Sequence, residues 1–228
     1  MGTKFSTRVW VSVVGIASIF FGSKGYADTV ISVADFGLKP DTRENAVAYV
    51  QKAIEACRGK EPVTLVFPEG RYDFWPQYAH EKNYYETNTY DVFPKRLAML
   101  FEGLHNITVD GNGSQFVMHD RIQPITVENC DGVTLKNFSI DWDIPLTAQA
   151  RVTKVGSDFF EIEINVLESP YIIEDGKLVF VGEGWKSALG SMIEFESDTH
   201  FVVPGTGDLV LGWNWGDYTA VSPRYGIV

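Results

Sequence analysis

An internal repeat constrains the fold of this chain more than any other feature. The segment LHNITVDGNG, residues 104–113, is echoed by CDGVTLKNFS, residues 130–139, and two more short strands lie between them in QFVMH and PITVEN. About three short strands per cycle, separated by Asn and Gly, are typical of one coil of a parallel β-helix. A β-sandwich is the alternative, because two cycles are a short sample of any period.

Three asparagines lie where the coils are expected to turn. Asn106, Asn129 and Asn137 each stand next to a predicted strand. Asparagine adopts the left-handed backbone conformation more readily than most residues and its side chain bonds to nearby backbone groups. We therefore expect these residues at the corners of the coils.

An amphipathic helix is predicted ahead of the repeat, in the segment TRENAVAYVQKAIEAC. Its apolar side chains recur at helical spacing, at Val47, Val50, Ile54 and Cys57. Thr42 is the predicted N-cap, with Glu44 in the first turn. The open end of a β-helix exposes strand edges that must be covered, and this helix is a natural lid. The segment VTLVFPEGRYDF then predicts a strand, a turn and a second strand.

After Pro145 the pattern changes to antiparallel hairpins. ARVTKV and FFEIEI flank a short turn, and Asp175-Gly176 marks a tight turn within YIIEDGKLVFV. The predicted fold is all-β. A right-handed parallel β-helix with an N-terminal capping α-helix spans residues 28–144, and an antiparallel, barrel-like β region spans residues 145–228.

Residues 1–27 have the pattern of a secretory signal peptide. A basic segment, MGTKFSTR, precedes the apolar segment VWVSVVGIASIFFG and the small-x-small site at Gly25-Tyr26-Ala27. We expect cleavage after Ala27 and an exported chain, periplasmic or secreted, that begins at Asp28. The apolar run is too short for a stable membrane span, so no membrane partner is expected.

The charge of the chain disfavours nucleic acid as a partner. The formal net charge is −11, and it becomes −14 once the three cations of the leader are removed. Such a surface repels phosphate backbones, so a neutral partner fits better. The four histidines are scattered without metal-ligand spacing, and we expect neither a metal site nor another cofactor.

The chain has two cysteines, Cys57 and Cys130, which lie 73 positions apart. Cys57 falls on the apolar face of the predicted helix and Cys130 follows a strand. Two buried free thiols are therefore favoured over a disulfide, although export would allow a bridge.

Asp141 and Asp143 are the first candidate site residues. In NFSIDWDIP they flank Trp142 at the end of a predicted strand, where side chains two residues apart share one face about 6 to 7 Å apart. This overlaps the lower end of the roughly 6.5 to 9.5 Å used by inverting glycosidases. A catalytic pair, however, needs two different environments. Sugar ligands, supports of the true pair and strand-end structure remain open roles.

His119 and Arg121 are the other candidates. They follow the predicted strand QFVM, where polar side chains leave the coil for its surface. Arg121 can donate a fork of hydrogen bonds to sugar oxygens or hold a carboxylate, and His119 can accept from a hydroxyl. The alternative is a structural salt bridge of Arg121 with Asp120 or Asp141.

Aromatic residues are dense in the segment 72–96, and Trp213 and Trp215 share a face of LGWNWG. Sugar rings present flat C–H faces that pack on aromatic rings, so the segment 72–96 is a candidate sugar platform. Packing of the rings against the protein's own core is the alternative, and we favour it for the two tryptophans.

Residues 93–150 closely resemble glycoside hydrolase family 110, the bacterial exo-acting α-1,3-galactosidases. The segment reads FPKRLAMLFEGLHNITVDGNGSQFVMHDRIQPITVENCDGVTLKNFSIDWDIPLTAQA, and ADFG and FPEGRYDFWP look like earlier parts of the same enzymes. The resemblance implies a β-helix with antiparallel β-domains. It also implies an exported enzyme that removes terminal α-galactose from galactose-terminated glycans, with inversion and without a metal. Family members are far longer, and their catalytic aspartates are expected beyond Val228.

Two other functions compete with this hypothesis. A β-helical polysaccharide lyase would recognise an acidic polymer, to which a chain of this negative charge is poorly suited. A non-catalytic glycan-binding module would bind sugars through aromatic loops and cleave nothing. As a fragment, the chain is expected to be inactive by itself, and its oligomeric state is left open.

Overall fold

The computed structural model describes residues 29–84, 94–204 and 209–210. The predicted signal peptide, the middle of the aromatic segment at 85–93, and Trp213 and Trp215 lie outside the described residues. Among the helices described, none is long and apolar enough to cross a membrane.

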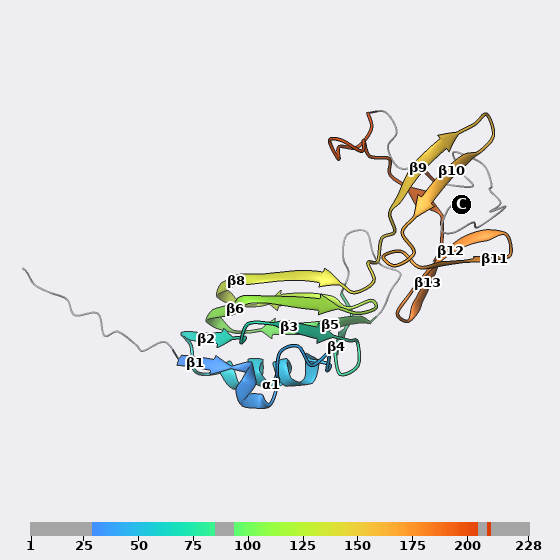
Figure 1. Cartoon of the computed structure of the whole chain (residues 1–228). Helices are drawn as coiled ribbons and strands as arrows, with labels where there is room; N and C mark the ends of the chain where they lie inside the picture. Colours follow the sequence, from blue (N-terminus) through green and yellow to red (C-terminus); the bar gives the residue numbers. More distant parts are fainter. Residues whose placement is uncertain (1–28, 85–93, 205–208, 211–228) are drawn as a thin grey trace, which may run out of the picture.

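Parallel strands form a stack along the first half of the chain (Figure 1). One sheet contains β1 (Thr29–Ser32), β2 (Val63–Val66), β3 (Arg71–Phe74), β6 (His105–Met118) and β8 (Asp131–Trp142), all paired in parallel. A second sheet contains β5 (Lys95–Glu102) parallel to β7 (Gln123–Glu128), with β4 (His80–Lys82) antiparallel to β5. As predicted, VTLVFPEGRYDF forms two strands, and both pair with β6 rather than with each other.

The predicted repeat corresponds to the register between β6 and β8. Ile107 pairs with Val133 and Val109 with Leu135, in parallel, as the alignment of the two segments requires. The three predicted corner asparagines have positive φ angles, of 49° at Asn106, 50° at Asn129 and 60° at Asn137. The predicted pairing and the left-handed backbone of the three asparagines are confirmed. Their placement differs from the prediction, because Asn129 follows the end of β7 whereas Asn106 is the second residue of β6 and Asn137 lies within β8.

The register shifts once within this pair of strands. It changes between Asp110 and Ser114, so that Ser114 pairs with Phe138 and not with Ile140, as an unbroken repeat would require. Gly111 lies at the shift, where a Cβ atom would approach the carbonyl oxygen of Asn137 to 2.7 Å. The prediction of a separate strand in QFVMH is wrong, because β6 continues through the shift as one bent strand.

The interior of the stack is apolar and well packed. Its largest fully buried side chains include Phe67, Tyr72, Phe74, Phe101 and Phe116. The rings of Phe67 and Phe116 lie 4.7 Å apart, and Phe116 stacks on Phe138 at 4.8 Å. Aromatic residues on successive coils therefore stack along the axis of the stack.

Helix α1 (Val47–Cys57) packs against the 3₁₀ helix η1 (Val33–Phe36) and strands β1, β2 and β5. The predicted apolar face is confirmed, since Val47, Val50, Ile54 and Cys57 are buried. In Figure 1 the helix lies on the β1 and β2 side of the stack, and β8 lies on the opposite side.

The helix begins later than predicted, at Val47. Thr42 is not its N-cap, and Glu44 precedes the helix, because Asp41 and Arg43 have left-handed φ angles of 61° and 62° that cannot belong to a helix. The Thr42 hydroxyl instead accepts a hydrogen bond from the Glu44 amide within a turn.

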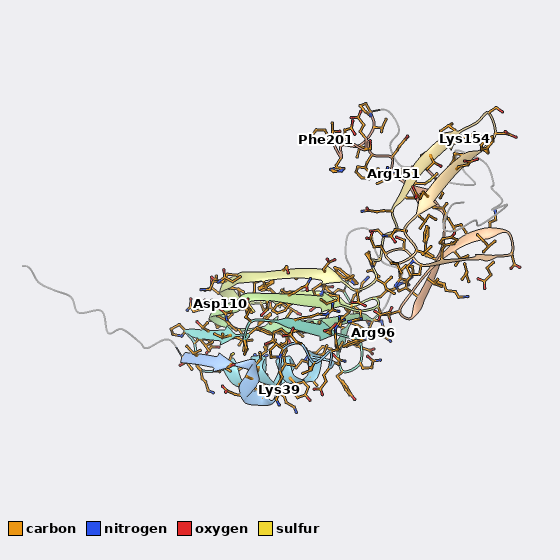
Figure 2. The ribbon with its side chains drawn as sticks, viewed as in Figure 1. Lys39, Arg96, Asp110, Arg151, Lys154 and Phe201 are labelled. Carbon is orange, nitrogen blue, oxygen red and sulfur yellow. The ribbon has the colours of Figure 1, made fainter. Side chains whose placement is uncertain are left out.

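Antiparallel strands follow the stack, as predicted. The strands are β9 (Ala150–Val155) with β10 (Phe160–Ile164), β11 (Tyr171–Glu174) with β12 (Lys177–Gly182) and β13 (Trp185–Ala188), and β14 (Ser191–Met192) with β15 (Leu209–Val210). The tight turn at Asp175-Gly176 has φ angles of 51° and 71°. Arg151 and Lys154 lie on β9, away from Asp110 in the stack (Figure 2).

Cys57 and Cys130 are both free thiols, as favoured, and no bridge joins them. Cys57 is buried as predicted, whereas Cys130 is only half-buried. Burial raises the pKa of the Cys57 thiol to about 11, which keeps it protonated and unreactive at neutral pH.

Candidate functional site: a charged cluster at the strand ends

A buried carboxylate at the end of β3 is the centre of the site. The Asp73 side chain is completely buried. Arg71, two residues earlier on the same strand, donates to it from Nη2 at 2.6 Å and from Nε at 3.0 Å. Side chains two residues apart share one face of a strand, so the local sequence by itself places this ion pair.

Arg71 also holds a second carboxylate. Asp143 follows the end of β8, and its Oδ1 lies 2.7 Å from Nη2 of Arg71. The backbone amide of Asp143 donates to the carbonyl of Met118 at 3.1 Å, which continues the ladder between β6 and β8. Arg43 lies on the solvent side, with Nη1 at 3.5 Å from Asp143 and 3.6 Å from Asp73.

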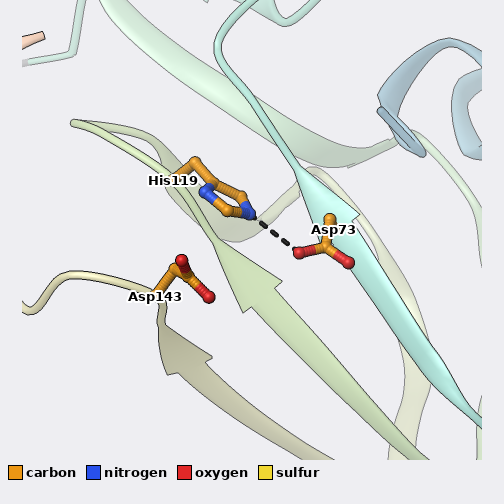
Figure 3. Close-up of side chains that lie close together, drawn as sticks. All are labelled: Asp73, His119 and Asp143. Carbon is orange, nitrogen blue, oxygen red and sulfur yellow. Dashed lines mark hydrogen bonds and ion pairs between the residues drawn. The ribbon is translucent and has the colours of Figure 1, made fainter. Parts of the chain in front are cut away.

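His119 is the third member of the cluster. Its buried ring places Nε2 2.8 Å from Oδ1 of Asp73 and Nδ1 2.7 Å from Oε2 of Glu183, in the turn between β12 and β13. Its face stacks on Trp75 with ring centroids 3.8 Å apart. Figure 3 shows His119 between the strand that carries Asp73 and the strand that leads to Asp143.

The shifted register explains why these residues meet. Phe74 pairs with Met118, and Met118 pairs with Trp142. The residues that follow these three are Trp75, His119 and Asp143, which therefore lie next to one another at the ends of neighbouring parallel strands. Parallel strands that end at the same edge bring their following residues together.

Both carboxylates are held in the ionised form. Burial by itself would raise the pKa of Asp73, but hydrogen bonds from Arg71 and His119 outweigh it and the pKa is lowered. The hydrogen bond from Arg71 lowers the pKa of Asp143 despite partial burial. The pKa of Arg71 is raised, chiefly by its hydrogen bond to Asp73.

The cluster has a donor set that a metal ion could use. Asp73, His119 and Asp143 offer ligand atoms that all lie within 4.8 Å of one another. The guanidinium groups of Arg71 and Arg43 already pair with both carboxylates and offset their charge. A metal ion at this place would be repelled by these two cations, so the arrangement fits an organic hydrogen-bonding ligand better than a metal.

Two of the four predicted site residues belong to the cluster, His119 and Asp143. Asp141 is exposed and its Oδ1 accepts a hydrogen bond from the Trp142 amide. Arg121 is also exposed, and within the described part of the chain it forms no ion pair with Asp120 or Asp141. Strand β8 ends at Trp142, so Asp143 lies one residue beyond the strand. The prediction that Asp141 and Asp143 share one face of a strand is therefore wrong.

The sequence interpretation missed Arg71, Asp73, Trp75 and Glu183. A local signal existed for the first two, since Arg71 and Asp73 alternate with the apolar Tyr72 and Phe74 in one strand and therefore face together. No local signal pointed to Glu183, which reaches His119 across 64 positions of the chain.

The fold and the site define a strand-rich protein that joins a parallel stack to an antiparallel β region through a charged cluster. Residues 148–226 match the family described as GLAA-B beta-barrel domain I. The chain is 59% identical to alpha-1,3-galactosidase B of Bacteroides thetaiotaomicron, over 86% of this chain and 32% of that protein. It is 36% identical to alpha-1,3-galactosidase A of Shewanella woodyi, over 73% of this chain and 28% of that protein.

A further relative is alpha-1,3-galactosidase B of Parabacteroides distasonis, 33% identical over 95% of this chain and 36% of that protein. The predicted resemblance to glycoside hydrolase family 110 is thereby confirmed. The chain spans about a third of the length of these relatives.

Proposed function

We propose that this chain is the N-terminal part of an exo-acting glycoside hydrolase that removes terminal α-1,3-linked galactose with inversion of configuration. The observation that carries the proposal is the 59% identity, over 86% of the chain, to a protein named alpha-1,3-galactosidase B. Galactose-terminated glycans are the corresponding substrates.

The parallel stack forms the first coils of a right-handed β-helix, with α1 as its cap. The parallel register of β2, β6 and β8 and the left-handed backbone of Asn106, Asn129 and Asn137 support this fold. The outer strand β8 leaves Leu135 and Ile140 more than a third exposed on the side away from the helix. Further coils of a longer protein would cover these side chains.

The charged cluster does not supply the acid and base of the reaction. Inversion requires one protonated carboxylic acid and one ionised carboxylate. Asp73 and Asp143 both have lowered pKa values, and Arg71 holds both, so neither is suited to be the acid. The catalytic carboxylates are expected on coils beyond Val228.

The cluster instead positions Asp143 and Arg43 for hydrogen bonding. Asp143 is 39% exposed and Arg43 is 59% exposed, whereas Asp73 and His119 behind them are buried. A carboxylate held rigidly by an arginine accepts hydrogen bonds from sugar hydroxyls, and a guanidinium donates to sugar oxygens. His119 supports this arrangement from inside and does not reach the surface.

The experiment compares the chain that ends at Val228 with a protein extended through the downstream reading frame. On an α-1,3-galactosyl oligosaccharide, the extended protein should release galactose, first as the β-anomer in an NMR time course. The shorter chain should release none. Turnover by the short chain, abolished by Asp143→Asn, would place the chemistry within these coils and overturn the assignment of roles.

Export through a cleaved leader is also part of the proposal. Residues 1–27 have the signal-peptide pattern, and the mature chain would begin at Asp28. N-terminal sequencing of the mature protein tests this. An intact leader on protein recovered outside the cytoplasm would contradict it.

A further inference from the structure

An exposed tyrosine is held in an uncommon backbone conformation beside helix α1. Tyr78 is 74% exposed and has a φ angle of 68°, in the left-handed region. A bulky residue there is a strained outlier. Two side-chain amides hold it, since Gln51 Nε2 donates to the Tyr78 carbonyl and Asn45 Nδ2 to the Gln77 carbonyl, each at 2.9 Å.

This arrangement fixes an aromatic ring in solvent rather than in the core. The backbone of residues 75 to 78 is tied to α1 through Gln51 and to Asn45, two residues before the helix, so the backbone that carries the ring has little freedom. Strain of this kind persists only where surrounding contacts determine the conformation, and it concentrates at binding sites.

The ring borders a shallow depression of about 390 Å³. Its lining consists of two tyrosines, an alanine and three polar side chains: Glu44, Asn45, Ala48, Tyr49, Lys52 and Tyr78. The volume lies within the roughly 300 to 1,000 Å³ of small-molecule sites. Glu44 and Lys52 carry opposite charges, so their fields offset each other and the depression favours a neutral ligand.

We propose that this depression, defined by Tyr49 and Tyr78 with the polar side chains around them, binds a pyranose ring of a neutral glycan. Aromatic rings pack on the C–H face of a sugar, while amide, carboxylate and ammonium groups bond its hydroxyls. The site is separate from the charged cluster. This depression is the sugar platform referred to below, and it is inferred from its own residues. Only the identity of the glycan as galactose-terminated rests on the proposed function.

The platform and the charged cluster are carried by the same segment. The backbone of Asn45 pairs with Asp73, and the Ala46 amide donates to the Asp73 carbonyl at 2.8 Å. Trp75 stacks on His119, and Tyr78 follows three residues later. A glycan bound at the platform would therefore lie near the charged cluster without contacting it.

The test is a titration of the full chain with a galactose-terminated oligosaccharide, followed by NMR line broadening and by calorimetry. Tyr78→Ala should weaken binding about tenfold, as expected for loss of one stacking contact. Tyr78→Phe keeps the ring face and should stay within about threefold of the wild type. Phe201→Ala is the matched control, because Phe201 is also 74% exposed, and it should bind like the wild type (Figure 2).

Equal binding by wild type and Tyr78→Ala, or equal losses in Tyr78→Ala and Tyr78→Phe, would overturn the platform. The extended protein separates this outcome from the proposed function. If the extended protein releases galactose and Tyr78→Ala does not change glycan binding, the proposed function is supported and the sugar platform is contradicted. If binding depends on the Tyr78 ring but no galactose is released, the sugar platform is supported and the proposed function is contradicted.

Discussion

The ring of His119 lies 2.7 Å from the carboxylate of Glu183, so the end of the parallel strand β6 is bonded to a turn of the antiparallel region. The other ring nitrogen lies 2.8 Å from Asp73. The His119 ring therefore links the carboxylates of Asp73 and Glu183 across the junction between the two regions.

Glu183→Ala should destabilise the junction between the two regions. It leaves a buried histidine nitrogen without its partner, which costs about 1 to 3 kcal/mol of the free energy of unfolding. Urea denaturation measures the loss, and hydrogen exchange should increase around the turn between β12 and β13. Glu174→Ala, which removes an exposed pair with Lys186, is the control and should cost less than about 1 kcal/mol. Equal losses in the two variants would contradict the bridging role.

Asp73→Asn should be the most damaging single change in the cluster. It preserves the shape of the side chain but removes the buried charge that Arg71 and His119 share. Breaking a buried pair costs about 3 to 5 kcal/mol, and because Arg71 keeps Asp143 as a partner we expect a loss near the lower end of that range. Thermal unfolding measures the effect. Asp131→Asn, at an exposed position, is the control, and a comparable drop in its melting temperature would refute the assignment.

The contribution of Asp143 to stability should depend on pH with a defined sign. Its pKa is lowered in the folded protein, so the folded state binds this proton less tightly than the unfolded chain does. The stabilisation is present above the unfolded pKa of about 3.9 and is lost as the pH falls through the lower folded value. The stability difference between wild type and Asp143→Asn should therefore be largest near neutrality and shrink below pH of about 4. A difference that grows with acid would contradict this sign.

In the extended protein, Asp143→Asn should raise KM for the galactoside more than it lowers kcat. The residue binds hydroxyls in our proposal and does not transfer a proton, and loss of a true acid or base typically costs about 10²-fold or more in kcat. Asp141→Asn should have a smaller effect, because Asp141 lies outside the cluster. Steady-state kinetics of both variants tests this, and a kcat loss of that size with KM unchanged would assign Asp143 to catalysis.

Val50→Asp should unfold or strongly destabilise the capping helix. Val50 is fully buried against the stack, and an unpaired carboxylate there costs several kcal/mol. Lys52→Asp places the same residue on the exposed face of the same helix and should cost less than about 1 kcal/mol. Circular dichroism during urea unfolding distinguishes the two variants. Similar midpoints would show that the helix face does not pack as described.

The elements themselves could be predicted because their causes are local. Alternation of apolar residues and the spacing of Val47, Val50 and Ile54 follow from the geometry of strands and helices. The left-handed preference of asparagine belongs to the residue itself, so the left-handed backbone of Asn106 and Asn137 could be predicted from the sequence. The start of the helix was missed because the left-handed Arg43 has no such signature in its side chain.

The candidate site was only half predictable, because its composition depends on register. An unbroken repeat that continued the pairing of Ile107 with Val133 would pair His119 with Pro145, whereas the shift at Gly111 brings Asp143 into line with it. The shift depends on how closely two coils approach, which a single repeat in the sequence does not reveal.

The sequence by itself determined most of the strands, the apolar face of the helix, the internal repeat and the resemblance to the α-1,3-galactosidases, since each is a property of neighbouring residues or of the string as a whole. The tertiary structure decided which charges meet. Asp73 can be buried because Arg71 compensates its charge and the His119 ring is hydrogen-bonded to it, and the partner on the far side of His119 comes from 64 positions away. A buried charge requires such partners in three dimensions, and no local pattern specifies them.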